Sequence, residues 1–175
     1  MSAADLMLVT PGLQWRDALL DMAREVSACG EMRYHQALTS FEAYLTRLED
    51  MRGGANLLPG RSPQCTFWAL DGSRLVGSSR IRHPLTPEME EFAGHIGYDI
   101  RPGARRQGYG SRLLALTLLE AAGMGLDGVW VNCLSDNIGS ARIIRSNGGV
   151  LVDERYNPSE GKVVLRHWIQ IHAAK

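Results

Sequence analysis

The chain has 175 residues, with 19 basic and 19 acidic residues and a formal net charge of zero. This length corresponds to about one domain, so we expect a single domain over residues 1–175. Zero net charge argues against bulk binding to nucleic acid or to a membrane surface, because both require a basic excess. The three cysteines are far apart and have no nearby histidine, which predicts neither a disulfide framework nor a metal site. We therefore expect a cytoplasmic protein with no nucleic-acid partner and no membrane partner.

The first half of the chain predicts one strand, two helices and a hairpin. Apolar residues recur at helical spacing over Trp15–Cys29, and Gly30 suits the end of that helix. Phe41–Leu48 carries the apolar positions of a second helix. The Asp71-Gly72 pair lies between two apolar runs, which is a strong hairpin signal. The expected strands are Leu6–Val9, Cys65–Leu70 and Leu75–Arg82.

The second half alternates strands and helices after a polar, proline-bearing loop at Pro84–Gly94. The helix expected at Ser111–Ala122 is apolar on several faces, as is usual for a helix buried between layers. The other expected elements are the strands Gly94–Ile100, Gly128–Cys133, Val150–Tyr156 and Lys162–Ile171 and the helix Asn137–Asn147. The order β-α-α-β-β-β-α-β-α-β-β predicts an α/β (α+β) fold with a single mixed sheet and helices on both faces.

The segment Arg105–Gly110 reads Arg-Arg-Gln-Gly-Tyr-Gly and lies between an expected strand and an expected helix. A glycine-bearing turn at a helix N-terminus presents backbone N–H groups and the positive end of the helix dipole, so it forms an anion cradle. Arg101 and Arg112 add to a local basic patch, either as phosphate contacts or as solvated side chains. The sequence therefore predicts a diphosphate-binding loop.

Two common phosphate loops do not fit this segment. A Walker P-loop needs lysine and a hydroxyl residue where Tyr109 and Gly110 stand. The dinucleotide fingerprint needs a third glycine after Gly108 and Gly110 at its own spacing, and the chain has none there. Both interpretations are rejected.

Ile100-Arg101-Pro102 followed by Arg105-x-x-Gly108-x-Gly110 resembles motif A of the GNAT acetyltransferase superfamily, V-x-P-x-x-[QR]-x-x-G-x-[GA]. The order of elements is also similar, so the resemblance covers nearly the whole chain and implies a mostly antiparallel, twisted sheet. Asn137, Ser140, Ala141 and Gly148 resemble the family's N-x-x-A helix and terminal glycine. Further segments look like a poorly characterised bacterial branch of the family: Phe67-Trp68, His95-Ile96-Gly97-Tyr98, Asn147-Gly148-Gly149 and Arg166-His167-Trp168-Ile169.

The resemblance implies acetyl-coenzyme A as the acyl donor and no metal. The diphosphate would lie on the N–H groups of Arg106–Gly110. The pantetheine arm would pair with the strand end Tyr98–Ile100, which the family splays from the next strand. The implied cofactor-binding residues are Tyr98, Ile100, Arg105, Arg106, Gln107, Gly108, Tyr109, Gly110, Ser111 and Asn137.

The family implies direct acetyl transfer to an amine of a small molecule or peptide, and three residues are candidate catalytic groups. His95 is either the general base or a structural histidine, and Tyr98 either donates to the leaving thiolate or packs in the core. Asp99 either orients the amine or is a solvated strand residue. Cys133 near the implied thioester is either reactive or a small buried hydrophobe. The acidic loop Leu85–Glu91 either attracts a cationic amine or is simply solvated.

Ile144 departs from the family pattern, because many members have a tyrosine acid seven residues after the motif asparagine. This departure keeps a second function open, a non-catalytic acyl-coenzyme A binding or sensing module. A third interpretation is a plain nucleotide-binding regulator. A homodimer also stays open as a partner, because many relatives pair through their last strands or sheet edges.

Overall fold

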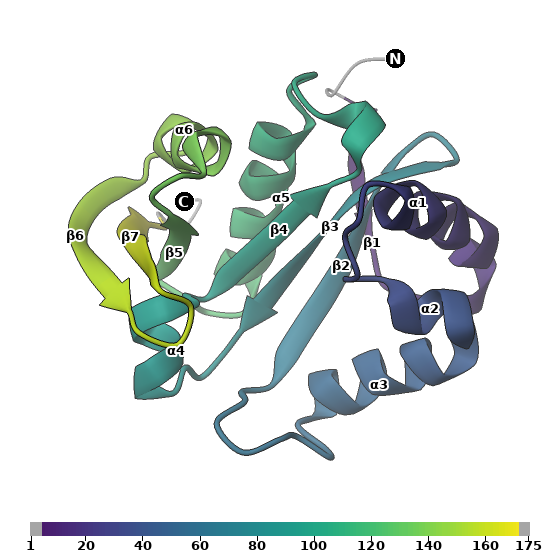
Figure 1. Ribbon diagram of the computed structural model, residues 1–175, viewed down its shortest axis with the longest axis horizontal. Helices are drawn as coiled ribbons and strands as arrows, with labels where there is room; N and C mark the ends of the chain where they lie inside the picture. The colour runs from purple at the N-terminus through teal and green to yellow at the C-terminus, as the bar shows by residue number, and fades with distance from the viewer. Residues whose placement is uncertain (1–4, 172–175) are drawn as a thin grey trace.

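The computed structural model describes residues 5–171, whose strands form two antiparallel sheets (Figure 1). The first sheet has the order β1-β2-β3-β4, with strands Met7–Val9, Gln64–Asp71, Arg74–Arg82 and Ile96–Ile100. The second has the order β5-β7-β6, with β5 at Gly128–Leu134, β6 at Val150–Asn157 and β7 at Lys162–Gln170. The expected α/β fold is confirmed, but its strands form two sheets rather than one continuous sheet.

Helices cover both faces of the first sheet, as Figure 1 shows. On one face lie α1, α2 and α3, at Arg16–Ala28, His35–Thr39 and Phe41–Gly53. The opposite face carries α5, at Tyr109–Gly123, which packs on β3 and β4, and α6, at Ile138–Ser146, contacts α5 and β5. The first face is closed by an apolar cluster that includes Leu19, Met22 and Trp68, all fully buried. β4 therefore has the α1–α3 layer on one of its faces and the α5–α6 layer on the other.

Two short helices were not expected from the sequence. The five residues of α2 are too few for a periodic apolar signal. The segment expected as a loop contains α4, Pro87–Phe92, whose first turn is capped by Thr86 accepting a hydrogen bond from the N–H of Met89 at 3.3 Å. A threonine cap followed by proline at the first helical position is a recognised start signal, so this helix could have been found.

Within residues 5–171, no helix combines the length and the apolar character needed to cross a bilayer. In the same part of the chain, no group of three or more His, Cys, Asp or Glu side chains is arranged to hold a metal ion. The three cysteines are free thiols.

Candidate functional site: an opening between two sheets

The two sheets meet at one end of β4 and part at the other. Gly94 forms an isolated antiparallel bridge with Val131, and the N–H of His95 donates to the carbonyl of Trp130 at 2.7 Å. Gly94 is required here, because a Cβ atom would lie 2.6 Å from that carbonyl oxygen. Past this junction, β4 pairs only with β3 among the described residues. The edge of β4 that faces β5 is therefore open.

Alternation along β4 identifies which backbone groups face the opening. The N–H of Arg101 donates to the carbonyl of Val76 at 2.9 Å, and Asp99 is paired with Ser78 in the same register. Because antiparallel pairs alternate between bonded and non-bonded positions, the backbone groups of Tyr98 and Ile100 point away from β3 into the opening. Buried backbone groups of this kind need a partner.

The loop after β4 supplies a second set of unpaired groups. Gly108 is the N-cap of α5 with φ of 85°, a left-handed conformation that favours glycine. Among residues 5–171, no acceptor is found for the backbone N–H groups of Arg106–Gly110. Gly110 lets α5 approach α6 closely, since a Cβ atom would lie 2.6 Å from Cδ1 of Ile143. The expected anion cradle is thus a row of backbone donors at the N-terminus of a long helix.

Most side chains of this loop form hydrogen bonds within the protein. Arg105 donates from Nε to the carbonyl of Ile100 at 3.0 Å and from Nη2 to Glu31 at 2.6 Å. Tyr109 is buried and its hydroxyl donates to Asp71. Gln107 donates to a backbone carbonyl at 2.9 Å. The side chains of these three residues are thus engaged within the protein, and the cofactor contacts expected of them stay a prediction. Arg106 and Arg112 are exposed near the helix start.

Arg101 does not serve a phosphate. Its side chain is buried and donates to Glu25 at 2.6 Å and to the carbonyl of Leu75 at 3.1 Å, and it lies 2.8 Å from Asp21. Both alternatives raised from the sequence, phosphate contact and solvation, are wrong, because this guanidinium joins α1 to the end of β4.

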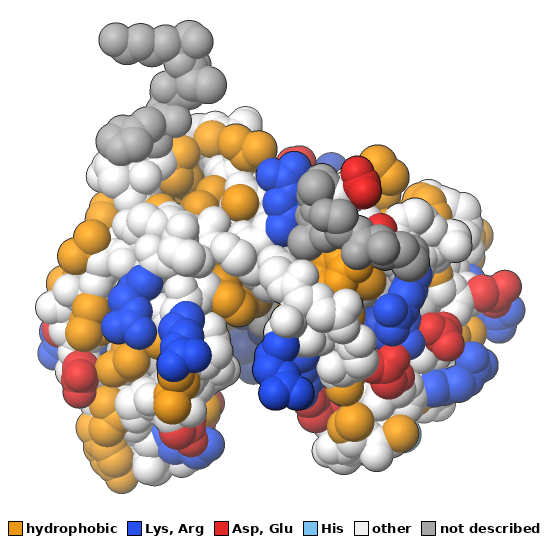
Figure 2. Space-filling view, turned by 90° about the horizontal axis from the view of Figure 1, so that it is seen from above, with side chains coloured by type: hydrophobic (Ala, Val, Ile, Leu, Met, Phe, Trp, Pro, Cys, Tyr) orange, Lys and Arg blue, Asp and Glu red, His pale blue; other side chains and the backbone are white. Residues whose placement is uncertain are grey.

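The N-terminus of α6 forms the other side of the opening. Asn137 caps the helix, because its Oδ1 accepts a hydrogen bond from the N–H of Ser140 at 3.0 Å. The Nδ2 group of the same side chain takes no part in the cap. Seen from above, the surface is hollowed between two lobes, with Lys and Arg side chains on both sides (Figure 2). Exposed arginines on this side are Arg106 and Arg112 near the start of α5, and Arg142 and Arg145 further along α6.

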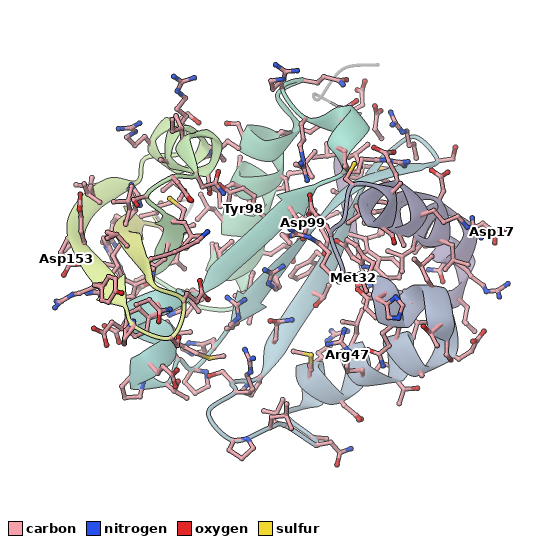
Figure 3. The ribbon with its side chains drawn as sticks, viewed as in Figure 1. Asp17, Met32, Arg47, Tyr98, Asp99 and Asp153 are labelled. Atoms are coloured by element: carbon pink, nitrogen blue, oxygen red, sulfur yellow. The ribbon has the colours of Figure 1, made fainter. Side chains whose placement is uncertain are left out.

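Tyr98 and Asp99 extend from β4 in opposite directions, Tyr98 toward α6 and Asp99 toward α1 and α2 (Figure 3). The hydroxyl of Tyr98 lies 2.8 Å from Oγ of Ser140. Burial raises the pKa of Tyr98 to about 12, although the hydrogen bond with Ser140 opposes this rise. Cys133, buried on β5, also lies near Ser140, and burial raises the pKa of its thiol. Ile144 is fully buried in the adjoining core.

Asp99 lies on the opposite side in a polar cluster. Oδ2 accepts a hydrogen bond from the hydroxyl of Tyr34 at 2.6 Å, and Oδ1 lies 3.5 Å from nitrogens of both Arg33 and Arg80. The Asp99 side chain is 8% exposed. Burial, followed by the charge of Asp99, raises the pKa of Tyr34 well above its ordinary value. This carboxylate is therefore held by three side chains that the sequence analysis did not connect with it.

His95 is engaged at the sheet junction. Its Nδ1 accepts a hydrogen bond from the N–H of Trp130 at 3.0 Å, and its ring stacks with that of His83, the centroids 6.2 Å apart. Burial, followed by the charges of His83 and Arg82, lowers the pKa of His95 to about 4. A neutral ring with Nδ1 occupied carries its proton on Nε2 and has no free lone pair. This geometry favours the structural interpretation of His95.

Comparison with known proteins gives the family. A model described as an acetyltransferase (GNAT) domain matches residues 14–150. The chain belongs to the GNAT acetyltransferase family. As a GNAT protein it is an acyltransferase that uses acetyl-coenzyme A, and the binding-only alternative is not favoured. No curated protein sequence matches the chain at a significant level.

Solved GNAT structures share the fold at low identity. An acetyltransferase from Salmonella typhimurium, which modifies the N-terminal serine of ribosomal protein L7/L12, is 15% identical over 96% of each chain, with a TM-score of 0.70. RimL in complex with coenzyme A, joined to a cysteine by a disulfide, is 18% identical over 97% of this chain and 96% of that one, with a TM-score of 0.71. A ribosomal-protein-S5-alanine acetyltransferase from Vibrio fischeri is 14% identical over 98% and 96%, with a TM-score of 0.72.

Proposed function

We propose that this GNAT protein transfers an acetyl group from acetyl-coenzyme A directly to a primary amine of a peptide or small molecule. The proposal rests on the opening between β4 and β5, where unpaired backbone groups of β4 meet the N–H groups at the start of α5. Acetyl-coenzyme A supplies an activated thioester together with a diphosphate and two amides, which match this set of groups. The resemblance at motif A supports the same placement.

On the donor side, the chain would bind and orient. The N–H groups of Arg106–Gly110 would hold the diphosphate, and the backbone groups of Tyr98 and the N–H of Ile100 would pair with the amides of the arm. The carbonyl of Ile100 already accepts a hydrogen bond from Arg105. The side-chain amide of Asn137 would add a donor from α6. Cys133 would lie near the sulfur end of the arm, which agrees with its position on the β5 side of the opening. No metal takes part in this scheme.

On the acceptor side, the ammonium would first lose one proton to water in the cavity, so that a neutral nitrogen attacks. As the C–N bond forms, Asp99 would accept the second proton that this nitrogen releases. The C–S bond then breaks and the thiolate leaves. Tyr98 would donate a hydrogen bond to the departing sulfur. With its pKa at about 12, against about 8.5 for a thiol, full proton transfer from Tyr98 would be uphill by about 5 kcal/mol. The thiolate would therefore leave as an anion and be protonated from water, which explains how the enzyme works with isoleucine at position 144.

Ser111→Glu tests the donor site without straining the backbone. Ser111 lies in the first turn of α5, where a carboxylate favours the helix but repels a diphosphate. We expect the affinity of the folded variant for coenzyme A, measured by calorimetry, to fall at least ~10-fold. Ser111→Ala is the matched control, because it also loses the hydrogen bonds of the Ser111 hydroxyl with Ser146 and Asn147 but adds no charge, and its affinity should stay near wild type. Thiol release with a panel of amines measures turnover in parallel. Unchanged affinity in the folded glutamate variant would remove the loop from the site, and binding without turnover on any amine would refute the transferase function.

A further inference from the structure

A cavity of about 460 Å³ lies on the Asp99 face of the first sheet, between the sheet, α3 and the segment that leads to β2. We propose that this cavity selects acceptor amines that carry a carboxylate or phosphate group. The proposal rests on the proposed function, in which the acceptor reaches β4 from the Asp99 side. The volume is in the range of small-ligand sites.

The charges that line the cavity are strongly unbalanced. One aspartate, Asp99, faces five arginines, although the whole chain has equal numbers of basic and acidic residues. The arginines come from four separate parts of the chain. They are Arg33 before α2, Arg47 on α3, Arg61 before β2, and Arg80 and Arg82 on β3.

Only part of this positive charge is compensated within residues 5–171. Arg33 and Arg80 share the carboxylate of Asp99, and Arg33 also lies 2.6 Å from Glu31. In the same described part of the chain, no acidic oxygen lies within 4.0 Å of Arg47, Arg61 or Arg82. These three guanidinium groups therefore have uncharged partners only: Arg47 lies over the ring of Tyr44, and Arg82 donates to a backbone carbonyl. Their charge is left for an anionic ligand. Figure 3 shows Arg47 on α3, across from the strands of the sheet.

The two strand arginines are built into the floor of the cavity. Arg80 and Arg82 are two residues apart on β3, so they lie on the same face of the sheet. Gly97 gives Arg80 its space, because a Cβ atom there would lie 2.9 Å from Nε of Arg80. Arg82 donates to the carbonyl of Gly94 at 3.1 Å.

Burial lowers the pKa of Arg82 to about 10, and the nearby charges of Arg80 and Arg61 lower it further in the same direction. Arg82 is still a cation at neutral pH, and the neighbouring charges of Arg80 and Arg61 repel it. A bound anion would relieve that repulsion. Bidentate hydrogen bonding makes guanidinium groups well suited to carboxylate and phosphate.

Strand geometry gives the distance between amine and anion. Ser78 is opposite Asp99 in the β3–β4 register, and Arg82 is four residues further along β3. At about 3.3 Å per residue, the backbone of Arg82 is about 13 Å along the strand from the level of Asp99. The guanidinium of Arg80 lies within this span, 3.5 Å from the Asp99 carboxylate. An extended peptide covers about 13 Å with about three to four residues. The best acceptors therefore carry the anion that far from the reactive nitrogen.

The glutamates of the Leu85–Glu91 segment do not change this conclusion. From α4, Met89 lines the cavity, and Glu88 lines an adjoining cavity beside β5 and β7 that shares Arg61 and Met89 with the first. The carboxylates of this segment therefore do not line the arginine cavity itself, although Glu88 lies next to it.

Matched acceptors test the proposal. Three tetrapeptide amides with N-terminal alanine would carry glutamate, glutamine or lysine at the third position, and a phosphoserine peptide would separate phosphate from carboxylate preference. We expect kcat/KM to be roughly tenfold higher for the glutamate peptide than for the glutamine peptide, and lowest for the lysine peptide. The preference should weaken when the assay contains about 0.5 M salt, because part of the cavity is open to water. At that ionic strength, the attraction between exposed charges is screened beyond about 4 Å.

Variants assign the preference to the cavity. In Arg47→Gln/Arg61→Gln the glutamate and glutamine peptides should differ by no more than about twofold. Arg52→Gln, on the same helix but outside the cavity, should keep the wild-type preference. Equal kcat/KM for all three peptides, or a preference for lysine, would overturn the proposal. Calorimetry distinguishes failure of the anion site from failure of the proposed function. If the glutamate peptide binds selectively but is not acetylated, acetyl transfer is refuted and the anion site stands. If neither binding nor kcat/KM is selective, the anion site is overturned.

Discussion

Arg101→Met tests whether a buried ion pair holds the end of β4 in place. The guanidinium contacts Glu25 and Asp21 of α1 and donates to the carbonyl of Leu75. Glu25 in turn accepts a hydrogen bond from the N–H of Gly103, in the turn that leads to the diphosphate loop. Methionine keeps much of the side-chain volume but removes every one of these polar contacts.

The expected loss follows from the exposure of the partner that remains. Removing one member of a buried ion pair costs about 3–5 kcal/mol, because the other charge stays without a partner. The Glu25 side chain is 27% exposed and keeps the Gly103 N–H, so water solvates it in part and the lower value of about 3 kcal/mol applies. For a chain of this size 1 kcal/mol corresponds to about 2–4 °C, so Tm should fall by about 6–12 °C.

The loss should depend on pH. Burial by itself raises the pKa of Glu25, but hydrogen bonds from Arg101 and Gly103 and the charge of Arg101 outweigh it and lower the pKa below 4.5. A carboxyl group with a lowered folded pKa stabilises the fold above its unfolded pKa, and that contribution disappears as pH falls through the folded value. The difference in Tm between wild type and variant should be full at pH 7 and shrink below pH 4.5.

Thermal unfolding at a series of pH values, followed by circular dichroism, measures both quantities. Arg24→Met is a matched control, because Arg24 lies exposed on the same α1 helix. A Tm within about 2 °C of wild type at pH 7 would refute the argument, since less than about 1 kcal/mol would then be lost. A difference that stays constant down to pH 3 would refute the assigned role of Glu25.

Two further predictions concern the chemistry at β4. Tyr98→Phe should lower kcat by about 3–10-fold with little change in KM for acetyl-coenzyme A, because one hydrogen bond of about 1 kcal/mol to the leaving sulfur is lost. Steady-state thiol release measures kcat, and an unchanged value would exclude Tyr98 as a donor to the sulfur. Asp99→Asn should lower kcat/KM by about 100-fold or more, whereas His95→Gln, which can still accept from Trp130, should keep kcat/KM within about threefold of wild type. If His95→Gln loses activity and Asp99→Asn keeps it, the base assignment is wrong.

The sequence predicted the features that depend on local spacing. The glycines of Arg105–Gly110 indicated an anion cradle because a left-handed turn before a helix requires them, and Gly108 has that conformation. Because neighbouring residues of a strand point to opposite faces, Tyr98 and Asp99 are separated by their spacing alone, and the fold shows them so. Family membership, inferred from motif A, is confirmed by the match over residues 14–150.

Contacts between distant segments could not be predicted in this way. Tyr98 and Ser140 are separated by 42 positions, and Tyr34 and Asp99 by 65, so no periodic pattern connects them. The arginines of the cavity come from four segments, and only the alternating pair Arg80 and Arg82 gave a local sign that they share a face. Side-chain roles also depend on the fold: Arg101 lies between the motif positions Ile100 and Pro102 but is buried against acids of α1.

The unpaired edge of β4 explains how one short strand can serve two substrates. Successive side chains of a strand point to opposite faces, so Tyr98 meets α6 on the proposed donor side while Asp99 meets the arginine-lined cavity on the proposed acceptor side. A shift of one residue in the β3–β4 register would exchange the two faces and turn the carboxylate toward Ser140 of α6. Fully buried Ile96 and the close approach of Gly77 to Asp99 both fix this register, since a Cβ atom on Gly77 would lie 2.4 Å from the carbonyl oxygen of Asp99. Ile96 and Gly77, which have no proposed contact with either substrate, thus determine which side chain of β4 faces each proposed substrate.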